Sequence, residues 1–438
     1  MQYFRNLPGR LAPAALIAVV LAIWVLLPVV ALLGCALLLA AWMVGTRPGR
    51  QATAVTWIGI LTLPQRLGAS SVIVIGIAGV VGVLVALLAL GGGLAATLRG
   101  TGNDVTAIVL RGGATAELDS GLAREDATLI LQAPGIAHDA EGRALGSAEI
   151  TVVTNIAKKS NHSEANVEIR GVGPQMWAVR PNVKIIEGRA FTPGLRELIV
   201  GRGAREEFIG LDPGATIDLN AQQWQIVGVF SSGDAHESEL VGDAETVASA
   251  YRRNGFQSVT VRLASPQSFD AFKAALKSDP RLKVDVRTTR AYYSAQSEQL
   301  SKVIRIVGIV IATIMAIGAV FGALNTMYAA INARAREVAT LRAIGFGPTP
   351  VVVSVVLEAM LLALLGGALG AAVTWVIFHD YAVSTLGANF SQVVFRFDVS
   401  PALIGTGIRW ALAIGLIGGL APALRAARLP VTTALRES

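Results

Sequence analysis

The stretch INARAREVATLRAIGFGPTP, residues 331–350, is a short basic segment between two long apolar runs. At 100° per residue its apolar side chains gather on one side and most charged side chains on another, which predicts an amphipathic helix. Gly345 and Gly347 are expected to end this helix, and Pro348 and Pro350 to prevent it from restarting. About 12 helical residues cannot cross a hydrocarbon core of about 30 Å, so the segment is expected at the membrane surface, where it offers one face to a soluble partner.

The composition is that of an integral membrane protein. Hydrophobic residues make up 53% of the 438 residues, charged residues only 15%, and the mean hydropathy is +0.57, which is too apolar for an ordinary soluble protein. Residues 99–300 hold 22 Lys and Arg against 25 Asp and Glu, whereas the rest of the chain holds 15 against 5. Because this basic excess lies beside apolar runs, it orients the protein in the membrane and does not indicate nucleic-acid binding.

Cysteine and histidine provide no recognisable metal site. Cys35 is the one cysteine, which excludes an intramolecular disulfide. Its neighbours loosely resemble a lipoprotein cleavage box, but apolar residues continue to position 44, so a cysteine buried in the membrane is expected. The four histidines share no ligand spacing and are expected at the surface. The segment from His236 to Glu239 looks catalytic but lies among Ser, Gly and Asp, so a solvated turn is expected.

Apolar runs predict the membrane spans. Residues 11–44 are too long for one span and fit a hairpin that turns near Pro28, with a single tilted helix and an interfacial tail as the alternative. Residues 51–70 are expected to form an interfacial cytoplasmic segment. Four further runs each fit one span: residues 71–98, 303–330, 351–378 and 401–424. Arginine falls mainly in the segments expected on the inside, which places both termini in the cytoplasm.

Small residues on two of these spans predict close helix packing. Ala78, Gly82 and Ala86 are spaced four apart on one span, and Gly318 and Gly322 are spaced four apart on another. Small side chains at this spacing let two helix backbones approach each other in a membrane.

The helix that contains residues 303–330 is expected to begin near residue 289, which is about twice the length that one span needs. Its outer part is polar through Tyr292, Tyr293 and Lys302 and is therefore predicted to protrude as a stalk. Residues 379–400 are expected to form a short external loop.

Glu358 and Arg409 are charged residues inside predicted spans. Each lies about eight residues, or about 12 Å, from opposite ends of the spans. The two side chains can pair with each other, or each can extend to its nearer surface. They are not interpreted as a proton relay.

Residues 100–293 have the pattern of a water-soluble α+β domain. Strands are predicted at residues 104–110, 149–154, 166–170, 197–201, 216–219, 224–230, 258–263 and 283–287. Helices are predicted at residues 122–131, 204–208, 245–254 and 266–278. About 190 residues are enough for a hydrophobic core of their own.

Short motifs follow one another along the chain in a characteristic order. They are GRAF at 188–191, LIVG at 198–201, WQIVGVF at 224–230, REVATLRAIGF at 336–346 followed by Glu358, GGALG at 366–370 and PALRAARLPVTTALR at 422–436. The first three resemble the MacB-type periplasmic core domain, and the others resemble the FtsX-like permease domain of type VII ABC transporters. Together these matches extend over residues 61–438, which is nearly the whole chain.

The resemblance implies a fold and a division into domains. The expected fold is an α-helical transmembrane bundle of four core helices plus an N-terminal hairpin, with a large α+β periplasmic domain. The expected domains are an N-terminal hairpin (1–50), an interfacial segment with the first core helix (51–99), a MacB-like core domain (100–293) and an FtsX-like permease domain (294–438). The last contains a coupling helix at 331–347 and a cytoplasmic tail. The expected location is the bacterial inner membrane.

The resemblance also implies partners. It predicts a homodimer in membrane lipid, a separate ATPase subunit that carries the ATP and Mg²⁺, and a periplasmic adaptor protein. The residues expected to contact the ATPase are Arg334, Arg336, Glu337, Val338, Leu341, Arg342, Ile344 and Gly345. ATP-driven closure of the ATPase would push this helix and move the periplasmic domains. The large MacB-like ectodomain favours export as the use of this movement.

Motifs for catalysis are absent from the sequence. There is no G-x-x-x-x-G-K-[ST] phosphate loop, G-x-S-x-G, H-E-x-x-H or C-x-x-C, so the chain is expected neither to hydrolyse ATP nor to hold a cofactor or metal ion. The alternative to export is a protein that transmits force to a periplasmic enzyme such as a cell-wall hydrolase, or that releases lipoproteins. A neighbouring gene for an adaptor would favour export, and one for a hydrolase would favour the alternative.

Overall fold

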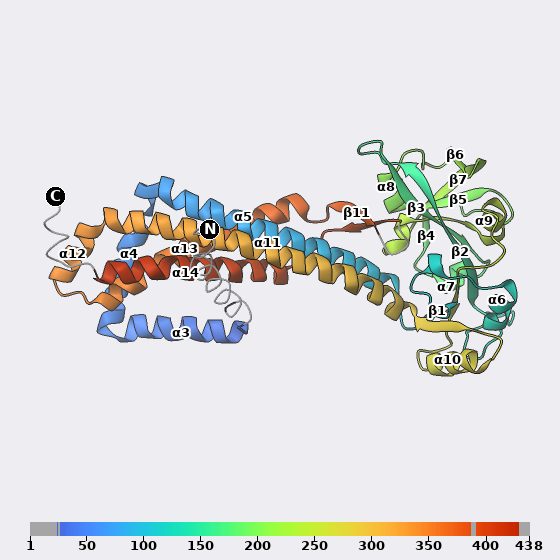
Figure 1. The fold of residues 1–438 in the computed structure, drawn as a ribbon, viewed down its shortest axis with the longest axis horizontal. Helices are drawn as coiled ribbons and strands as arrows, with labels where there is room; N and C mark the ends of the chain where they lie inside the picture. Colours follow the sequence, from blue (N-terminus) through green and yellow to red (C-terminus); the bar gives the residue numbers. More distant parts are fainter. Residues whose placement is uncertain (1–23, 25–26, 387–390, 429–438) are drawn as a thin grey trace, which may run out of the picture. The chain divides into compact units, whose positions relative to one another are not determined.

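The structure is a computed structural model that describes residues 24, 27–386 and 391–428. It divides into two compact units, one of membrane helices and one built on a β-sheet (Figure 1). The membrane unit lies within Met1–Leu90, Val303–His379 and Asp398–Ser438, and the ectodomain unit comprises Gly91–Lys302 and Asp380–Phe397. Two long helices, α5 (Leu67–Thr101) and α11 (Thr289–Ala333), continue from one unit into the other.

The membrane unit contains the spans predicted from the apolar runs. Within the described residues, four helices are long and apolar enough to cross a membrane. They are α5, α11, α13 (Pro348–Phe378) and α14 (Pro401–Arg428). The cytoplasmic helix α12 (Ala335–Ala343) joins α11 to α13. The four predicted core spans are therefore confirmed.

The N-terminal part forms a bent helix pair. Helix α3 (Val29–Gly45) begins directly after Pro28, and α4 (Arg47–Leu61) follows it at an angle of 101°, with a short 3-10 helix η1 (Leu63–Arg66) next. Helix α4 packs against α13. The first part of the hairpin predicted over residues 11–44 lies outside the described residues.

Small residues bring the spans into close contact. A Cβ atom placed on Gly370 of α13 would lie 2.3 Å from the carbonyl oxygen of Ala78 on α5, which is closer than any side chain tolerates. The Thr374 hydroxyl donates a hydrogen bond to the Gly82 carbonyl at 3.2 Å. The close packing predicted for Ala78 and Gly82 is confirmed, because their backbone meets a glycine and a threonine one helical turn apart.

The second predicted pair of small residues behaves differently. Among the described residues, no neighbouring atom lies within 4 Å of a Cβ placed on Gly318 or Gly322 of α11. Both glycines line a hollow of about 330 Å³ between α11 and α5. The face of α11 that carries these two glycines is therefore open, whereas Val320 and Ala323 on the same stretch lie against Gly418 of α14.

The ectodomain unit is organised around one mixed sheet of ten strands. Its strand order is β10-β1-β9-β2-β3-β8-β5-β7-β4, with β6 paired to β7. Only β3–β8 and β5–β7 are parallel pairs. The strands are β1 (Thr106–Arg111), β2 (Gly146–Ala157), β3 (Glu164–Val172), β4 (Lys184–Gly188), β5 (Glu197–Gly201), β6 (Thr216–Leu219), β7 (Gln222–Ser231), β8 (Leu240–Asp243), β9 (Ser258–Arg262) and β10 (Val284–Thr288).

Short helices connect these strands. They are η2 (Glu117–Asp119), α6 (Arg124–Leu131), α7 (Met176–Val179), α8 (Arg202–Glu207), η3 (Ala235–Ser238), α9 (Ala244–Ala250) and α10 (Ser268–Ser278). The eight predicted strands and four predicted helices are all present, whereas β4, β8 and α7 were not predicted. The external loop predicted at 379–400 instead contains a hairpin of two strands, β11 (Ala382–Leu386) and β12 (Gln392–Arg396), which belongs to the ectodomain unit.

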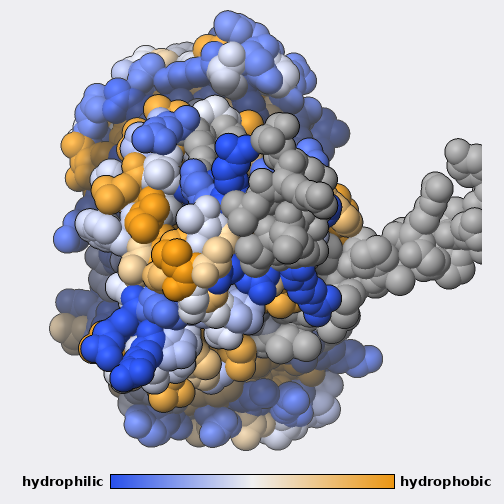
Figure 2. Space-filling model, turned by 90° about the vertical axis from the view of Figure 1, so that its left-hand side faces the viewer, coloured by the Kyte–Doolittle hydropathy of each residue, from blue (hydrophilic) through white to orange (hydrophobic). Residues whose placement is uncertain are grey.

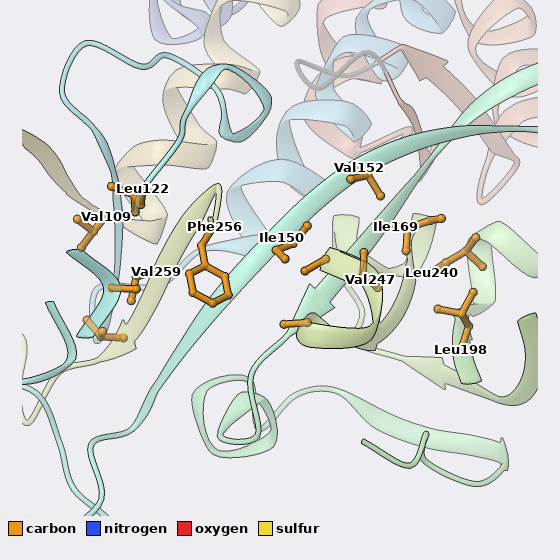
Figure 3. Packing of buried hydrophobic residues seen from close by; sticks show 14 of the residues in the cluster. Val109, Leu122, Ile150, Val152, Ile169, Leu198, Leu240, Val247, Phe256 and Val259 are labelled. Carbon is orange, nitrogen blue, oxygen red and sulfur yellow. The ribbon is translucent and has the colours of Figure 1, made fainter. Parts of the chain in front are cut away.

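The central strands have two chemically different faces. One face carries Ile150, Ile169 and Val259, which join the main hydrophobic core with residues such as Phe256 and Val247 (Figure 3). Side chains alternate along a strand, so the residues in between point to the other face. Those residues are polar and also buried: Glu149, Thr151, Glu168, Arg170, Ser258 and Thr260. The ectodomain thus buries a polar layer as well as an apolar core.

Candidate functional site

The predicted cytoplasmic helix is present as α12, and a break at Arg334 separates it from α11. Arg334 has φ −105° and ψ 9°, which is not helical, and it serves as the N-cap residue of α12. At the other end Gly345 has φ +104°. The amide of Gly345 donates to Arg342 and that of Phe346 donates to Leu341, which is a Schellman motif that needs glycine at the left-handed position. The predicted end at Gly345 is therefore confirmed.

The prediction for the two prolines is wrong. Helix α13 begins at Pro348, directly after its N-cap residue Gly347. Proline suits the first position of a helix because the N–H that it lacks would have no helical partner there. The turn between α12 and α13 is consequently only a few residues long.

Arg334 connects three segments of the membrane unit. Its Nη1 lies 2.9 Å from Oε2 of Glu358 on α13. Its Nη2 donates to the Gly59 carbonyl at 3.4 Å and to the Thr62 hydroxyl, both at the end of α4. We call these four residues the Arg334 junction. Its two charged side chains are mostly buried, with 15% of Arg334 and 6% of Glu358 exposed.

Gly59 has a steric role in this junction. A Cβ placed on Gly59 would lie 3.2 Å from Oε2 of Glu358 and 3.7 Å from Nη1 of Arg334. The glycine therefore leaves room for the ion pair beside the α4 backbone. This contact could not be predicted from the sequence, because Gly59 and Glu358 are far apart in the chain.

The apolar side of α12 faces inward. Val338 and Leu341 line a pocket of about 40 Å³ together with Ile331, Arg334 and Glu358. Leu341 and Ile344 are both expected from the sequence to contact the ATPase. Leu341 is only partly exposed, whereas Ile344 is open, with 68% of its surface exposed.

The outward side of α12 is mixed in character. Its exposed residues include Arg336, Glu337, Thr340 and Ile344. Figure 2 views the end of the molecule where Figure 1 labels α12, and it shows hydrophobic and hydrophilic side chains interspersed there. A surface of this kind suits a protein partner, since aliphatic contact is combined with charge that sets orientation.

Glu358 and Arg409 do not pair with each other. Glu358 binds Arg334, whereas Nη2 of Arg409 donates to the Leu27 carbonyl at 2.8 Å. The indole of Trp24 donates in turn to the Arg409 carbonyl at 3.2 Å. Arg409 therefore fastens the segment before α3 to α14.

The ectodomain holds a second charged site, which sequence reasoning missed. The guanidinium of Arg170 is 2.8 Å from Glu117, 3.1 Å from Glu149, 2.6 Å from Glu168 and 2.7 Å from Glu239. Glu149 also binds Arg180. With His236, which lies 2.9 Å from Glu239, these residues form what we call the Arg170 network.

The expectation that His236 and its neighbours form a solvated turn is wrong. His236 is 5%, Ser238 3% and Glu239 7% exposed. The segment is the 3-10 helix η3, and it packs against the polar face of the sheet, so its polar side chains meet those of β2 and β3. The sequence of such a carboxylate-rich segment does not show whether the segment lies in water or packs against a buried arginine.

Protonation of His236 is coupled to this network. Burial disfavours the imidazolium, but the carboxylates of Glu239 and Asp234 outweigh burial and the repulsion from Arg180, so the pKa of His236 is raised. The ring of Tyr293 packs edge-on against the imidazole at 5.9 Å. A raised folded-state pKa adds stability below the ordinary value of about 6.5, and that contribution disappears as pH rises through the folded-state pKa.

We therefore expect the ectodomain to lose stability as the pH is raised from about 6 to about 8. The measurement is the unfolding midpoint of the full-length protein in detergent, followed through hydrogen exchange of the ectodomain strand β7, which contains the buried Trp224. His236→Gln should flatten this dependence, because glutamine cannot take up the proton. An unchanged pH dependence in His236→Gln would contradict the assignment.

Two models of known protein families match this chain. A family model described as "MacB-like periplasmic core domain" matches residues 70–279, and one described as "FtsX-like permease C-terminal" matches residues 309–431. Together they include nine of the ten strands of the ectodomain sheet and most of the segment from α11 to α14.

Curated relatives show similarity over most of this chain. The chain is 24% identical over 340 residues to "Macrolide export ATP-binding/permease protein MacB" of Burkholderia pseudomallei, covering 72% of this chain and 50% of that protein. It is 24% identical over 312 residues to "Uncharacterized ABC transporter permease YknZ" of Bacillus subtilis, covering 66% of this chain and 76% of that protein. The chain thus spans about half the length of the MacB relative.

Solved structures align with part of the chain. The periplasmic region of MacB from Actinobacillus actinomycetemcomitans aligns with 45% of this chain and 94% of its own, at 17% identity and a TM-score of 0.35. The extracellular domain of YknZ from Gram-positive bacteria aligns with 42% of this chain and 100% of its own, at 17% identity and a TM-score of 0.33.

Proposed function

Since this chain belongs to the FtsX/MacB-type permeases of ABC transporters, we propose that it transmits the work of ATP hydrolysis on a partner ATPase to its periplasmic domain. It is a multi-pass protein of the inner membrane with an α+β periplasmic domain. In this proposal the ATPase contacts α12, the chain itself carries out no catalysis, and ATP with Mg²⁺ remains on the partner.

The construction of α12 is the observation that carries the proposal. Its inward side contacts α11 and α13 through Val338 and Leu341, and the Arg334 junction adds α4. Its outward side keeps Ile344 and several charged residues exposed. A short helix that is exposed on one side and fixed to three helices on the other can pass a push to the whole unit.

A second copy of the chain is part of the proposal. Of the four spans, α11 is the least covered, with 22% of its apolar window buried against 39% to 50% for the others. Its exposed apolar residues include Ile306, Val310, Ile314 and Phe321. The open glycines Gly318 and Gly322 lie on the same helix, and small residues favour close contact between membrane helices. These features support a homodimer through α11.

Export is the use that we propose for this movement, together with a periplasmic adaptor. The support is the printed description of the MacB relatives, which names macrolide export for proteins 24% to 26% identical to this chain. Activation of a periplasmic enzyme and release of lipoproteins would use the same movement of the ectodomain. Stimulation of ATP hydrolysis by macrolides in the reconstituted complex would favour export.

Ile344→Asp is expected to weaken ATPase binding without affecting the fold of the permease. Burial of an isoleucine contributes about 1.5–3 kcal/mol, so its loss should lower the affinity by at least about tenfold. Because Ile344 is 68% exposed, its replacement costs the free permease little. The measurement is retention of the co-expressed ATPase on the purified permease, together with the rate of ATP hydrolysis.

The matched control is Ile186→Asp, which makes the same change on the ectodomain strand β4, where Ile186 is 53% exposed. It should retain the ATPase fully. Leu341→Asp is unsuitable for this comparison, because it places a carboxylate in the pocket beside Glu358. Full retention of the ATPase by Ile344→Asp would argue against α12 as the docking helix.

A further inference from the structure

The hairpin β11–β12 is part of the ectodomain although it is connected in sequence to α13 and α14. The chain passes between the two units at four places: Leu90 to Gly91, Lys302 to Val303, His379 to Asp380 and Phe397 to Asp398. The first two are within α5 and α11. The last two flank the hairpin, so its hold on the rest of the ectodomain is entirely non-covalent.

The hairpin is held by specific contacts along its length. On β11, the Ser384 hydroxyl donates to Glu207 at 2.8 Å and accepts from Nζ of Lys158 at 3.0 Å. On β12, the Val394 amide donates to the Ser238 hydroxyl at 2.8 Å. Val394 also packs against α8, since a Cβ placed on Gly203 would lie 3.2 Å from the Val394 Cβ.

One contact leads from the hairpin into the Arg170 network. Ser391 is 3% exposed and its hydroxyl donates to Oε2 of Glu168 at 3.2 Å. The other oxygen of Glu168 binds Nη2 of Arg170 at 2.6 Å. A single carboxylate therefore joins the hairpin to the central guanidinium.

Helix α11 reaches the same guanidinium from another direction. Tyr292 and Tyr293, which we expected on a protruding polar stalk, are 1% and 7% exposed. The Tyr292 hydroxyl accepts a hydrogen bond from the amide of Glu117 at 3.1 Å. The carboxylate of Glu117 binds both Nη1 and Nη2 of Arg170, at 2.8 and 3.0 Å.

We propose that the Arg170 network is a mechanical joint at which two inputs meet, one from α11 and one from α13 and α14 through the hairpin. In this view the ectodomain is moved by all four spans, and the hairpin remains clamped throughout the ATPase cycle. The proposal rests on the proposed function of the chain, because it concerns the path by which movement reaches the ectodomain.

The physical reason is the stiffness of a buried ionic network. Each carboxylate gives up its contact with Arg170 only by breaking an ion pair between buried charges, which is costly in a medium of low dielectric constant. The network therefore moves as one body when Tyr292 or Ser391 is displaced. A purely structural role would predict that the hairpin can detach without affecting movement of the ectodomain.

A disulfide between Gly203→Cys and Val394→Cys tests whether the hairpin stays clamped. The Cβ separation of 3.2 Å is a few tenths of an ångström shorter than the roughly 3.5–4.5 Å of natural disulfides, so a small shift of the hairpin allows the bond to form. Cys35→Ser removes the one native thiol. Hydrogen exchange of the β2–β3 turn in the assembled complex, with and without ATP, reports movement of the ectodomain. The oxidised form should show the same ATP-dependent change in exchange as the reduced form.

Val394→Pro tests the effect of releasing the β11–β12 hairpin from the rest of the ectodomain. Proline removes the hydrogen bond from the Val394 amide to the Ser238 hydroxyl, whereas Val394→Thr keeps it and is the matched control. Val394→Pro should retain ATP hydrolysis but lose about half of the ATP-dependent change in exchange, because two of the four connections pass through the hairpin.

Several outcomes would overturn the joint. It falls if the oxidised disulfide abolishes the ATP-dependent change, since the hairpin must then detach, or if Val394→Pro leaves that change intact. If the unmodified complex neither retains an ATPase nor responds to ATP, the proposed function itself fails, and the joint fails with it.

Discussion

Arg170→Met is expected to unfold the ectodomain or to lower its unfolding free energy by about 3–5 kcal/mol. Arg170 is 2% exposed and contacts four carboxylates that are themselves buried. Methionine fills a similar volume but leaves those carboxylates with Arg180 as the remaining guanidinium of the network. The measurement is the urea midpoint of the full-length protein in detergent.

The matched control for Arg170→Met is Arg124→Met. Arg124 also forms an ion pair, with Glu245 at 2.7 Å, but the two side chains are 45% and 61% exposed. Exposed ion pairs contribute at most about 1 kcal/mol, so this variant should unfold at nearly the same urea concentration as the unmodified protein. Equal effects of the two substitutions would show that the Arg170 network does not stabilise the fold.

The pH response of Arg170→Met should differ from that of the unmodified protein. Nearby arginines lower the pKa of Glu149 and of Glu239 despite the opposing effect of burial. Carboxylates with lowered pKa stabilise the fold above their ordinary pKa, and this contribution is lost as the pH falls. Without Arg170 this contribution shrinks, so any folded Arg170→Met protein should be relatively less destabilised under acidic conditions.

The spans and most strands could be predicted because their signals are local. The apolar runs of α5, α13 and α14 exceed the length that a membrane requires, and β5 and β6 alternate or run apolar between turn residues. Strands β4 and β8 were missed although they are no shorter than β5 and β6. Their sequences, KIIEG and LVGD, neither alternate between apolar and polar residues nor form a sustained apolar run.

The Arg170 network could not be predicted for a different reason. Period-two alternation in β2 and β3 shows that Glu149, Glu168 and Arg170 share one face, but it does not show what covers that face. The cover comes from Tyr292 and from η3, which are distant in sequence. A polar face normally implies solvent, and only the tertiary structure reveals that this one is buried.

The same limit applies to α12. The sequence predicted the helix and its glycine end, because both depend on neighbouring residues. It could not show that the apolar side faces α13, since a basic amphipathic helix at a membrane can turn that side toward lipid, a partner or its own bundle. The contact of Arg334 with Gly59 and Glu358 decides the matter.

The Arg334 junction has a mechanical consequence. Its arginine is located at the break between α11 and α12, so a displacement of α12 acts on this residue before it reaches the long helix. Through Glu358 the displacement also reaches α13, and through Gly59 and Thr62 it reaches α4. If the junction is removed, α12 can pivot about the non-helical break at Arg334 without moving the other helices.

Arg334→Met is therefore expected to leave ATP hydrolysis by the partner intact while reducing the movement of the ectodomain. The variant should still bind the ATPase through Ile344, but the ATP-dependent change in ectodomain hydrogen exchange should fall by about tenfold, since loss of the ion pair withdraws more than about 1.4 kcal/mol of coupling. Glu358→Gln should have a smaller effect, because the arginine keeps its contacts with Gly59 and Thr62.

The control for Arg334→Met is Arg336→Met, which removes an exposed arginine two residues further along the same segment. It changes the charge of the segment equally but leaves the Arg334 junction intact, so movement of the ectodomain should be retained.

The exchanged pair Arg334→Glu with Glu358→Arg distinguishes an ion pair from a general need for arginine at the break. Partial recovery in the exchanged pair is expected, since the attraction between α12 and α13 is restored while the contacts of the arginine with α4 change. If Arg334→Met and Arg336→Met reduce movement of the ectodomain equally, then that movement depends on the positive charge of the segment and not on the buried Arg334 junction.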